Sequence, residues 1–161
     1  MSWDFEPDRL ENALLQERPG IVHLASHAQF TGDPDTSFVL THDDRLSMER
    51  LSSLLRASRY GSEPVELLML SACQTAAGDE RAALGLAGVA IRAGVNASFG
   101  SLWSVSDEAT RHLVIDFYEA LGEPGTSKAR ALQQAQNTLR QDKRFRHPYY
   151  WAPFLIINNW L

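Results

Sequence analysis

Two short apolar runs in this chain each lead into a residue that can carry out covalent chemistry. Residues 21–26 precede His27, and residues 65–72 precede Cys73. Apolar runs of this length, bounded by Gly or Pro upstream and by polar residues downstream, predict buried β-strands. Ligands of an open parallel sheet bind at the carboxyl ends of its strands. If these two strands are parallel neighbours, His27 and Cys73 emerge at the same edge, as a base and a nucleophile.

The remaining pattern alternates helices with strands. Helices are expected at residues 7–17, after the cap Ser47, at 82–93, between Ser106 and Gly122, and after the cap Thr126. Further strands are expected at residues 37–41, 97–103 and 154–157, and residues 27–35 are expected to form a polar loop. This alternation predicts an α/β sandwich with a mainly parallel sheet, formed by residues 1–161 as a single domain.

Composition restricts the partners and the compartment. The 161 residues carry a net charge of −5 without a basic cluster, which argues against a nucleic-acid partner. The single cysteine excludes an internal disulfide and fits a reducing compartment. No apolar stretch approaches the roughly 20 residues of a membrane span, and the acidic start lacks the layout of a signal peptide. We therefore expect a cytoplasmic protein that does not bind a membrane.

Each candidate residue also has a purely structural interpretation. Cys73 could be a buried cysteine acting as a small hydrophobe, and His27 could cap a loop at the end of its strand. His23 precedes His27 by four residues, but a His-x-x-x-His zinc pair works on a helix rather than on a strand. We therefore expect no metal site and no cofactor, and we interpret His23 as a buried, hydrogen-bonded strand residue.

Four short motifs occur together along the chain. They lie at residues 23–27 (HLASH), 70–76 (LSACQTA), 101–108 (SLWSVSDE) and 149–154 (YYWAPF). In this order they closely resemble the CHAT domain, a caspase-like domain that is often fused to tetratricopeptide repeats. The third motif also resembles its counterpart in separases. The resemblance extends from about residue 19 to the last residue, which is nearly the whole chain.

The resemblance implies a caspase-like three-layer α/β fold and cysteine peptidase chemistry, a hydrolase activity. The catalytic histidine of the family falls on His27, and its nucleophile falls on Cys73. The family carries further strands and helices before the histidine strand, whereas about one helix precedes it here. The chain is therefore expected to be the catalytic C-terminal part of a larger domain. The expected partners are a protein or peptide substrate and a tetratricopeptide-repeat region, in cis or in trans.

One departure from the family pattern concerns the oxyanion site. The resemblance implies backbone N–H donors at Cys73 and at the residue after the histidine, which is usually Gly and here is Ala28. If this position needs a positive φ, alanine costs energy and misdirects the donor. If φ is negative, alanine is tolerated and only narrows the groove. The alternative to an endopeptidase is thus a catalytically weak or inactive caspase-like interaction or signalling module.

Substrate-binding residues are also suggested by the third motif. Asp107 matches an acidic position that resembles part of the substrate pocket of separases, where a carboxylate would pair with a basic P1 residue. Asp107 is equally explained as an acid in the first turn of a helix, which the helix dipole favours. Trp103 could form a wall of the same pocket or fill the core. The prediction is a cysteine endopeptidase with a His27/Cys73 dyad and a preference for basic P1.

Overall fold

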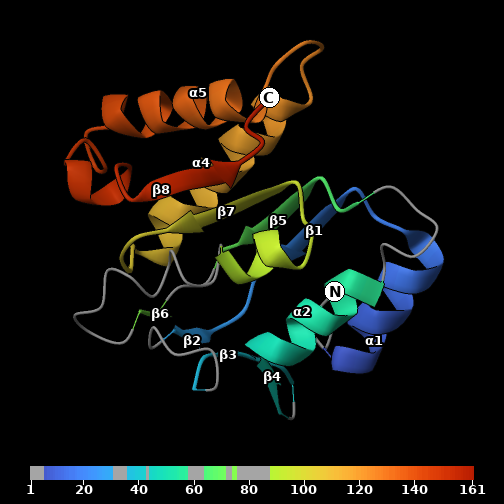
Figure 1. Ribbon diagram of the computed structural model, residues 1–161. Helices are drawn as coiled ribbons and strands as arrows, with labels where there is room; N and C mark the ends of the chain where they lie inside the picture. The colour runs from blue at the N-terminus through green and yellow to red at the C-terminus, as the bar shows by residue number, and fades with distance from the viewer. Residues whose placement is uncertain (1–5, 31–35, 43, 58–63, 72–73, 76–87) are drawn as a thin grey trace.

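The computed structural model describes residues 6–30, 36–42, 44–57, 64–71, 74–75 and 88–161 (Figure 1). Cys73 and the first part of the helix predicted at 82–93 lie outside the described residues. Residues 88–92 of that helix are helical, and Gly94 follows with a φ of 94°, as expected for a glycine that ends a helix.

The main sheet holds both strands that were predicted from the apolar runs. Its strand order is β1-β5-β7-β8, formed by β1 (Ile21–Leu24), β5 (Leu67–Leu70), β7 (Ala97–Ser101) and β8 (Phe154–Asn158). β1, β5 and β7 are parallel, while β8 pairs with β7 in the antiparallel direction. The register of β1 and β5 runs from Ile21 opposite Leu67 to Leu24 opposite Leu70. The two apolar runs are therefore parallel neighbours, which is the condition on which the shared edge of His27 and Cys73 depended.

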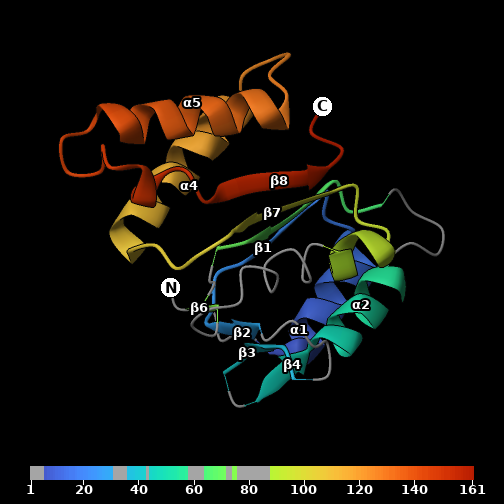
Figure 2. The same ribbon diagram turned by 60° about the vertical axis from the view of Figure 1, so that its left-hand side comes forward.

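Helices cover both faces of this sheet, as two views of the chain show (Figures 1 and 2). One helical layer is built around α4 (Asp107–Leu121) and α5 (Lys128–Gln141). The other contains α1 (Pro7–Asn12), the π-helical turn η1 (Ala13–Glu17) and α2 (Met48–Ala57). A 3-10 turn, η2 (Pro148–Tyr150), precedes β8. The mainly parallel sheet between two helical layers is the α/β sandwich that was expected.

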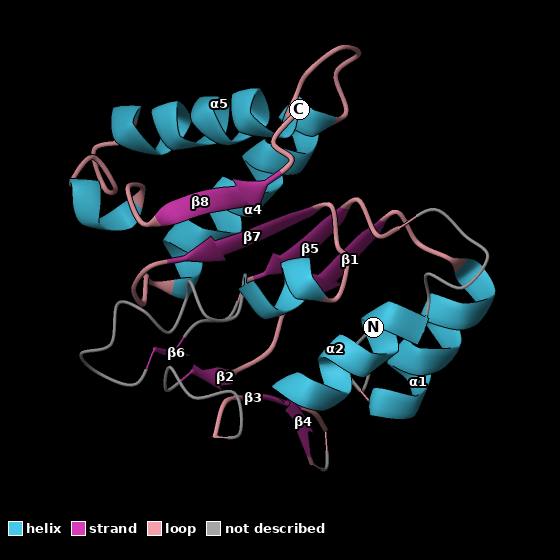
Figure 3. Cartoon of the chain, viewed as in Figure 1, coloured by secondary structure: helices cyan, strands magenta, loops and turns pink. Residues whose placement is uncertain are grey.

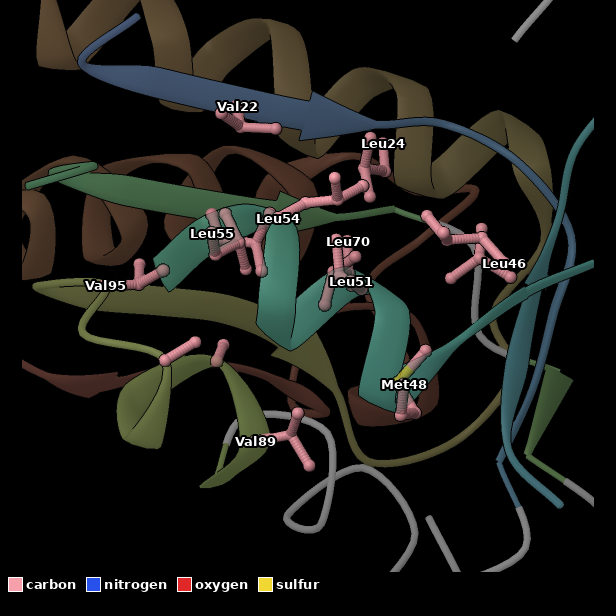
Figure 4. Close-up of a cluster of buried hydrophobic side chains, with 14 of the residues drawn as sticks. Val22, Leu24, Leu46, Met48, Leu51, Leu54, Leu55, Leu70, Val89 and Val95 are labelled. Carbon is pink, nitrogen blue, oxygen red and sulfur yellow. The ribbon is translucent and has the colours of Figure 1, made fainter. Parts of the chain in front are cut away.

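The alternation of side chains along β5 explains the two layers. Leu68 and Leu70 point into the core cluster beneath α2, whereas Leu67 and Met69 point into the cluster beneath α4 and α5. All four side chains are buried, as is typical of a central parallel strand. Figure 4 shows the first cluster, where leucines of α2 meet Val22, Leu24 and Leu70. The second cluster centres on aromatic and leucine side chains: Phe99, Leu113, Phe117, Leu139, Phe145 and Phe154.

A small second sheet lies beyond the carboxyl ends of the main strands (Figure 3). Its order is β4-β3-β2-β6, formed by β2 (Ala28–Phe30), β3 (Phe38–Leu40), β4 (Arg45–Ser47) and β6 (Gln74–Thr75). The prediction of a loop throughout residues 27–35 was therefore wrong for β2. Three residues carry too little pattern to be recognised, and β2 exists because β3 and β6 pair with it from both sides.

Side-chain caps start the helices largely where they were expected. The Ser106 hydroxyl accepts a hydrogen bond from the Ala109 N–H at 3.3 Å, and the Ser47 hydroxyl accepts from the Arg50 N–H at 3.2 Å. The cap predicted at Thr126 was wrong by one residue. Ser127 takes that position because its hydroxyl accepts from the Arg130 N–H at 3.3 Å.

Candidate active site

The two candidate catalytic residues follow strands that pair in matching register. Leu24 of β1 lies opposite Leu70 of β5, and His27 and Cys73 each come three residues after these partners in the sequence. Beyond them the chain pairs again, because Gln29 of β2 lies opposite Gln74 of β6 in the parallel direction. The chain segments on both sides of His27 are therefore paired with the chain segments on both sides of Cys73.

A cavity of about 680 Å³ opens at this edge of the main sheet. His27 lines it from the segment after β1, and Ser71 lines it from the segment after β5. Asp107 and Arg111 line it from the first turns of α4. The cavity thus collects groups from the carboxyl ends of parallel strands and from a helix N-terminus, where α/β proteins bind ligands.

Two hydrogen bonds to β3 hold the backbone around His27. The Leu40 N–H donates to the His27 carbonyl at 2.7 Å, and the Ser26 hydroxyl donates to the Leu40 carbonyl at 2.6 Å. The His27 side chain itself is exposed and faces the cavity. An imidazole in this position is anchored through its main chain while its ring stays accessible to a substrate.

His23 lies four residues before His27 and lines the same cavity. Its Nε2 lies 2.8 Å from the Ser71 hydroxyl, and its ring centroid lies 5.7 Å from that of Tyr118 on α4. The expected hydrogen bond is confirmed, but the expected burial was wrong, because β1 is the outer strand of the described sheet and His23 retains exposed surface. Desolvation of the covered part lowers the pKa of His23 below its ordinary value.

Ala28 adopts the less demanding of the two conformations considered for it. Among the described residues other than glycine, only Arg18 and Asn158 have a positive φ, so the φ of Ala28 is negative. Its side chain is 5% exposed and belongs to the core cluster beneath α2. The methyl group therefore fills core space, and it is not among the groups that line the cavity.

The backbone of Ala28 is oriented by its position in β2. Because the Leu40 N–H bonds to the His27 carbonyl, the next pair, Ala28 and Val39, is of the non-hydrogen-bonded type. The N–H of Ala28 consequently points away from β3, toward the side on which β6 pairs with β2. The N–H of Ala28 is therefore on the side of β2 that β6 (Gln74–Thr75) occupies.

Charged groups on α4 give the cavity its electrostatic character. Asp107 is the first residue of α4, and Arg111 follows one helical turn later. Within the described part of the chain, neither side chain forms an ion pair, whereas the adjacent Glu108 pairs with Arg144 at 2.8 Å. The Asp107 carboxylate is thus exposed to the cavity and available to a cationic ligand.

Trp103 stands outside the set of residues that line the cavity. Its indole N–H donates to the Tyr149 carbonyl at 3.0 Å, and the two rings stack with centroids 6.4 Å apart. The Tyr149 hydroxyl in turn donates to the Ser104 carbonyl at 2.6 Å, and Ser104 lines the cavity. Trp103 therefore contacts Tyr149, which in turn holds the cavity residue Ser104. Direct contact of the Trp103 ring with substrate stays a prediction.

Sequence reasoning did not identify Ser71, Ser104 or Arg111 as cavity residues. Ser104 lies in a loop and Arg111 lies on a helix, and the sequence around each is typical of an ordinary protein surface. Ser71 carried a usable signal, because it is a polar residue directly after a fully buried strand. His23 also carried one, because the period of two along a strand places it on the same side as His27.

The described residues contain no group of three or more His, Cys, Asp or Glu side chains that could hold a metal ion. None of their helices has the length and apolar character needed to cross a membrane.

Comparison with known proteins agrees with the motifs. The family model of the CHAT domain matches residues 1–159, which is almost the entire chain. A comparison with curated proteins returned no match. The matched range includes both candidate catalytic residues and Asp107.

Proposed function

Because the chain belongs to the CHAT domain family, we propose that it is a cysteine endopeptidase in which Cys73 is the nucleophile and His27 moves the protons. The family is related to caspase-like peptidases, so a protein or peptide is the substrate class to test first. The observation that carries this proposal is the paired arrangement of the chain on both sides of His27 and Cys73.

The proposed reaction proceeds through an acyl-enzyme. The Cys73 sulfur attacks the carbonyl carbon of the scissile peptide bond as a thiolate, forming a C–S bond. The C–N bond then breaks, and the imidazolium of His27 gives its proton to the leaving amine. Water then gives a proton to His27 and attacks the thioester carbonyl carbon, forming a C–O bond. The C–S bond breaks, the product leaves with its new carboxyl group, and His27 returns the proton to the Cys73 sulfur.

The developing negative charge on the carbonyl oxygen needs backbone donors. We assign this role to the N–H groups of Ala28 and Cys73, and one such donor contributes about 2.7–4 kcal/mol in related acyl transfers. Two observations support Ala28 in this role: its φ is negative, and its N–H points away from β3. A strained alanine was one of two reasons for expecting an inactive module, and the negative φ argues against it. The other reason, the short segment before the histidine strand, stands unchanged.

Asp107 supports a preference for a basic P1 residue. Its carboxylate faces the cavity that His27 also lines, and no described residue forms an ion pair with it, although Arg111 lines the same cavity. An arginine side chain of the substrate could make two parallel hydrogen bonds to this carboxylate. We therefore propose Arg, and then Lys, as the preferred residue on the carbonyl side of the scissile bond.

Hydrolysis of fluorogenic peptides tests the proposal. The panel carries Arg, Lys, Leu or Asp at P1, and wild type is compared with Cys73→Ala and His27→Ala. We expect turnover with Arg and Lys that both variants abolish. Turnover of the wild type that survives in Cys73→Ala would show that another group carries the reaction. A protein that is folded but inactive on every peptide would favour the interaction module.

A further inference from the structure

One side-chain hydrogen bond joins the two strand ends that lead to the proposed dyad. His23 Nε2 on β1 and the Ser71 hydroxyl after β5 lie 2.8 Å apart. The regular pairing of β1 and β5 ends at Leu24 and Leu70, and the Ser71 N–H extends it by donating to the Leu24 carbonyl at 3.2 Å. Ser71 is thus held through its main chain and its side chain, both times by β1.

The partner of this bond is itself fixed in place. The ring of His23 lies 5.7 Å from that of Tyr118, and Tyr118 packs edge-on against the fully buried Phe117 of the same helix. The imidazole thus packs against α4 on one side and keeps exposed surface on another. The ring contact and the hydrogen bond to Ser71 together restrict the side-chain rotamer of His23, so the hydrogen bond can fix a position.

The two candidate catalytic segments are thus held by different partners. Hydrogen bonds to Leu40 of β3 fix the backbone at His27, whereas His23 fixes Ser71, two residues before Cys73 in the sequence. Catalysis by proximity requires the reacting groups to keep their geometry, and small displacements cost large factors in rate. The hydrogen bond between His23 and Ser71 can supply such a geometric constraint, because Ser71 precedes Cys73 by two residues in the sequence.

We propose that His23 is a positioning residue of the cysteine peptidase site, and that it acts by holding Ser71 and so fixing the segment that leads to Cys73. This inference rests on the proposed function. It assigns His23 no contact with the substrate and no proton transfer, because its Nε2 already engages the Ser71 hydroxyl.

Alkylation kinetics of the full chain test the proposal. The probe is a peptidyl acyloxymethyl ketone with Arg at P1, and the inactivation rate constant and the probe's inhibition constant are measured separately. His23→Phe keeps a ring against Tyr118 but removes the hydrogen bond. His23→Gln removes the ring but places an amide near the position of Nε2. Ser71→Ala removes the bond from the other side, and the thermal midpoint of each variant reports folding.

We expect His23→Phe and Ser71→Ala each to lower the inactivation rate constant about tenfold with an unchanged inhibition constant. The double variant should lose no more than either single variant, because both remove the same bond. His23→Gln should restore most of the rate. If His23 acted through packing alone, His23→Phe would instead keep the wild-type rate and His23→Gln would be impaired.

Other results would overturn the assignment. Unchanged rates in His23→Phe and Ser71→Ala would show that the bond has no positioning role. A complete loss in His23→Phe, with full labelling in His27→Ala, would make His23 the catalytic base. Failure of the wild type to be labelled at all would contradict the proposed function itself, and it is therefore distinguishable from failure of this inference.

Discussion

His27 and Asp107 are eighty positions apart in the sequence and line the same cavity. His27 reaches it from the end of an outer strand, and Asp107 reaches it from the first turn of α4. An imidazole and a carboxylate therefore face one space, which is the combination that the proposed cleavage after a basic residue would use.

Replacement of Asp107 by Asn should reduce the selectivity for basic substrates. The charge is lost while the shape and the helix start are kept, so kcat/KM for Arg at P1 should fall about tenfold relative to Leu at P1. Glu108→Gln is the matched control, because Glu108 is the next residue and pairs with Arg144 instead of lining the cavity. An equal effect of both variants would show a general electrostatic effect in place of a specific contact.

Replacement of Ala28 by Gly should not raise turnover. The φ of Ala28 is already compatible with alanine, so glycine relieves no strain at the proposed oxyanion donor. The change removes a buried methyl group and adds backbone freedom, which should lower the free energy of unfolding by about 1–2 kcal/mol. Urea denaturation and peptide hydrolysis measure the two effects. A gain in turnover would mean that Ala28 limits the oxyanion site after all.

The main architecture was predictable because its signals are local and repeated. The apolar runs of β1 and β5, the Ser106 cap and the long pattern of α4 each identify an element without knowledge of the rest of the fold. Parallel pairing then follows from the intervening helix, and His27 is correctly placed at the sheet edge. The family motifs added the chemistry, which no periodicity contains.

The small sheet and the cavity wall were not predictable in the same way. β2 and β6 have three and two residues, and they exist through pairing between segments that are far apart in the sequence. The exposure of His23 depends on the strand order, because β1 is the outer strand of the sheet among the described residues. Arg111 enters the cavity only through the packing of α4 across the sheet.

The imidazole of His23 should titrate below its ordinary pKa of about 6.5. Desolvation penalises the protonated ring in the folded chain, so the unfolded chain takes up this proton first as pH falls through 6.5. His23 should therefore reduce stability on the acidic side of that pH. Tyr118→Leu admits water to the ring and should move the pKa back upward. NMR titration of the ring protons measures it, and a wild-type pKa at or above 6.5 would contradict the expectation.

Phe99 should contribute strongly to the stability of the fold, because it packs in the core beside Phe154, which lines the cavity. Phe99 is 0% exposed, and its ring centroid lies 5.2 Å from that of Phe117 and 5.9 Å from that of Phe154. Phe99→Ala should cost about 3–5 kcal/mol, a large share of the roughly 5–15 kcal/mol of a typical domain. Leu15→Ala, at a position 41% exposed, serves as the control for urea denaturation and should change stability little. Similar losses in both variants would contradict the core assignment.

Intact mass after exposure to peptidyl acyloxymethyl ketones tests the central claim most directly. Probes with Arg, Asp or Leu at P1 are compared on wild type, Cys73→Ser and His27→Ala. We predict a single adduct that forms fastest with the Arg probe, is absent in Cys73→Ser and forms far more slowly in His27→Ala. Labelling no faster than that of the denatured thiol, or labelling that does not depend on His27, would contradict a His27/Cys73 dyad.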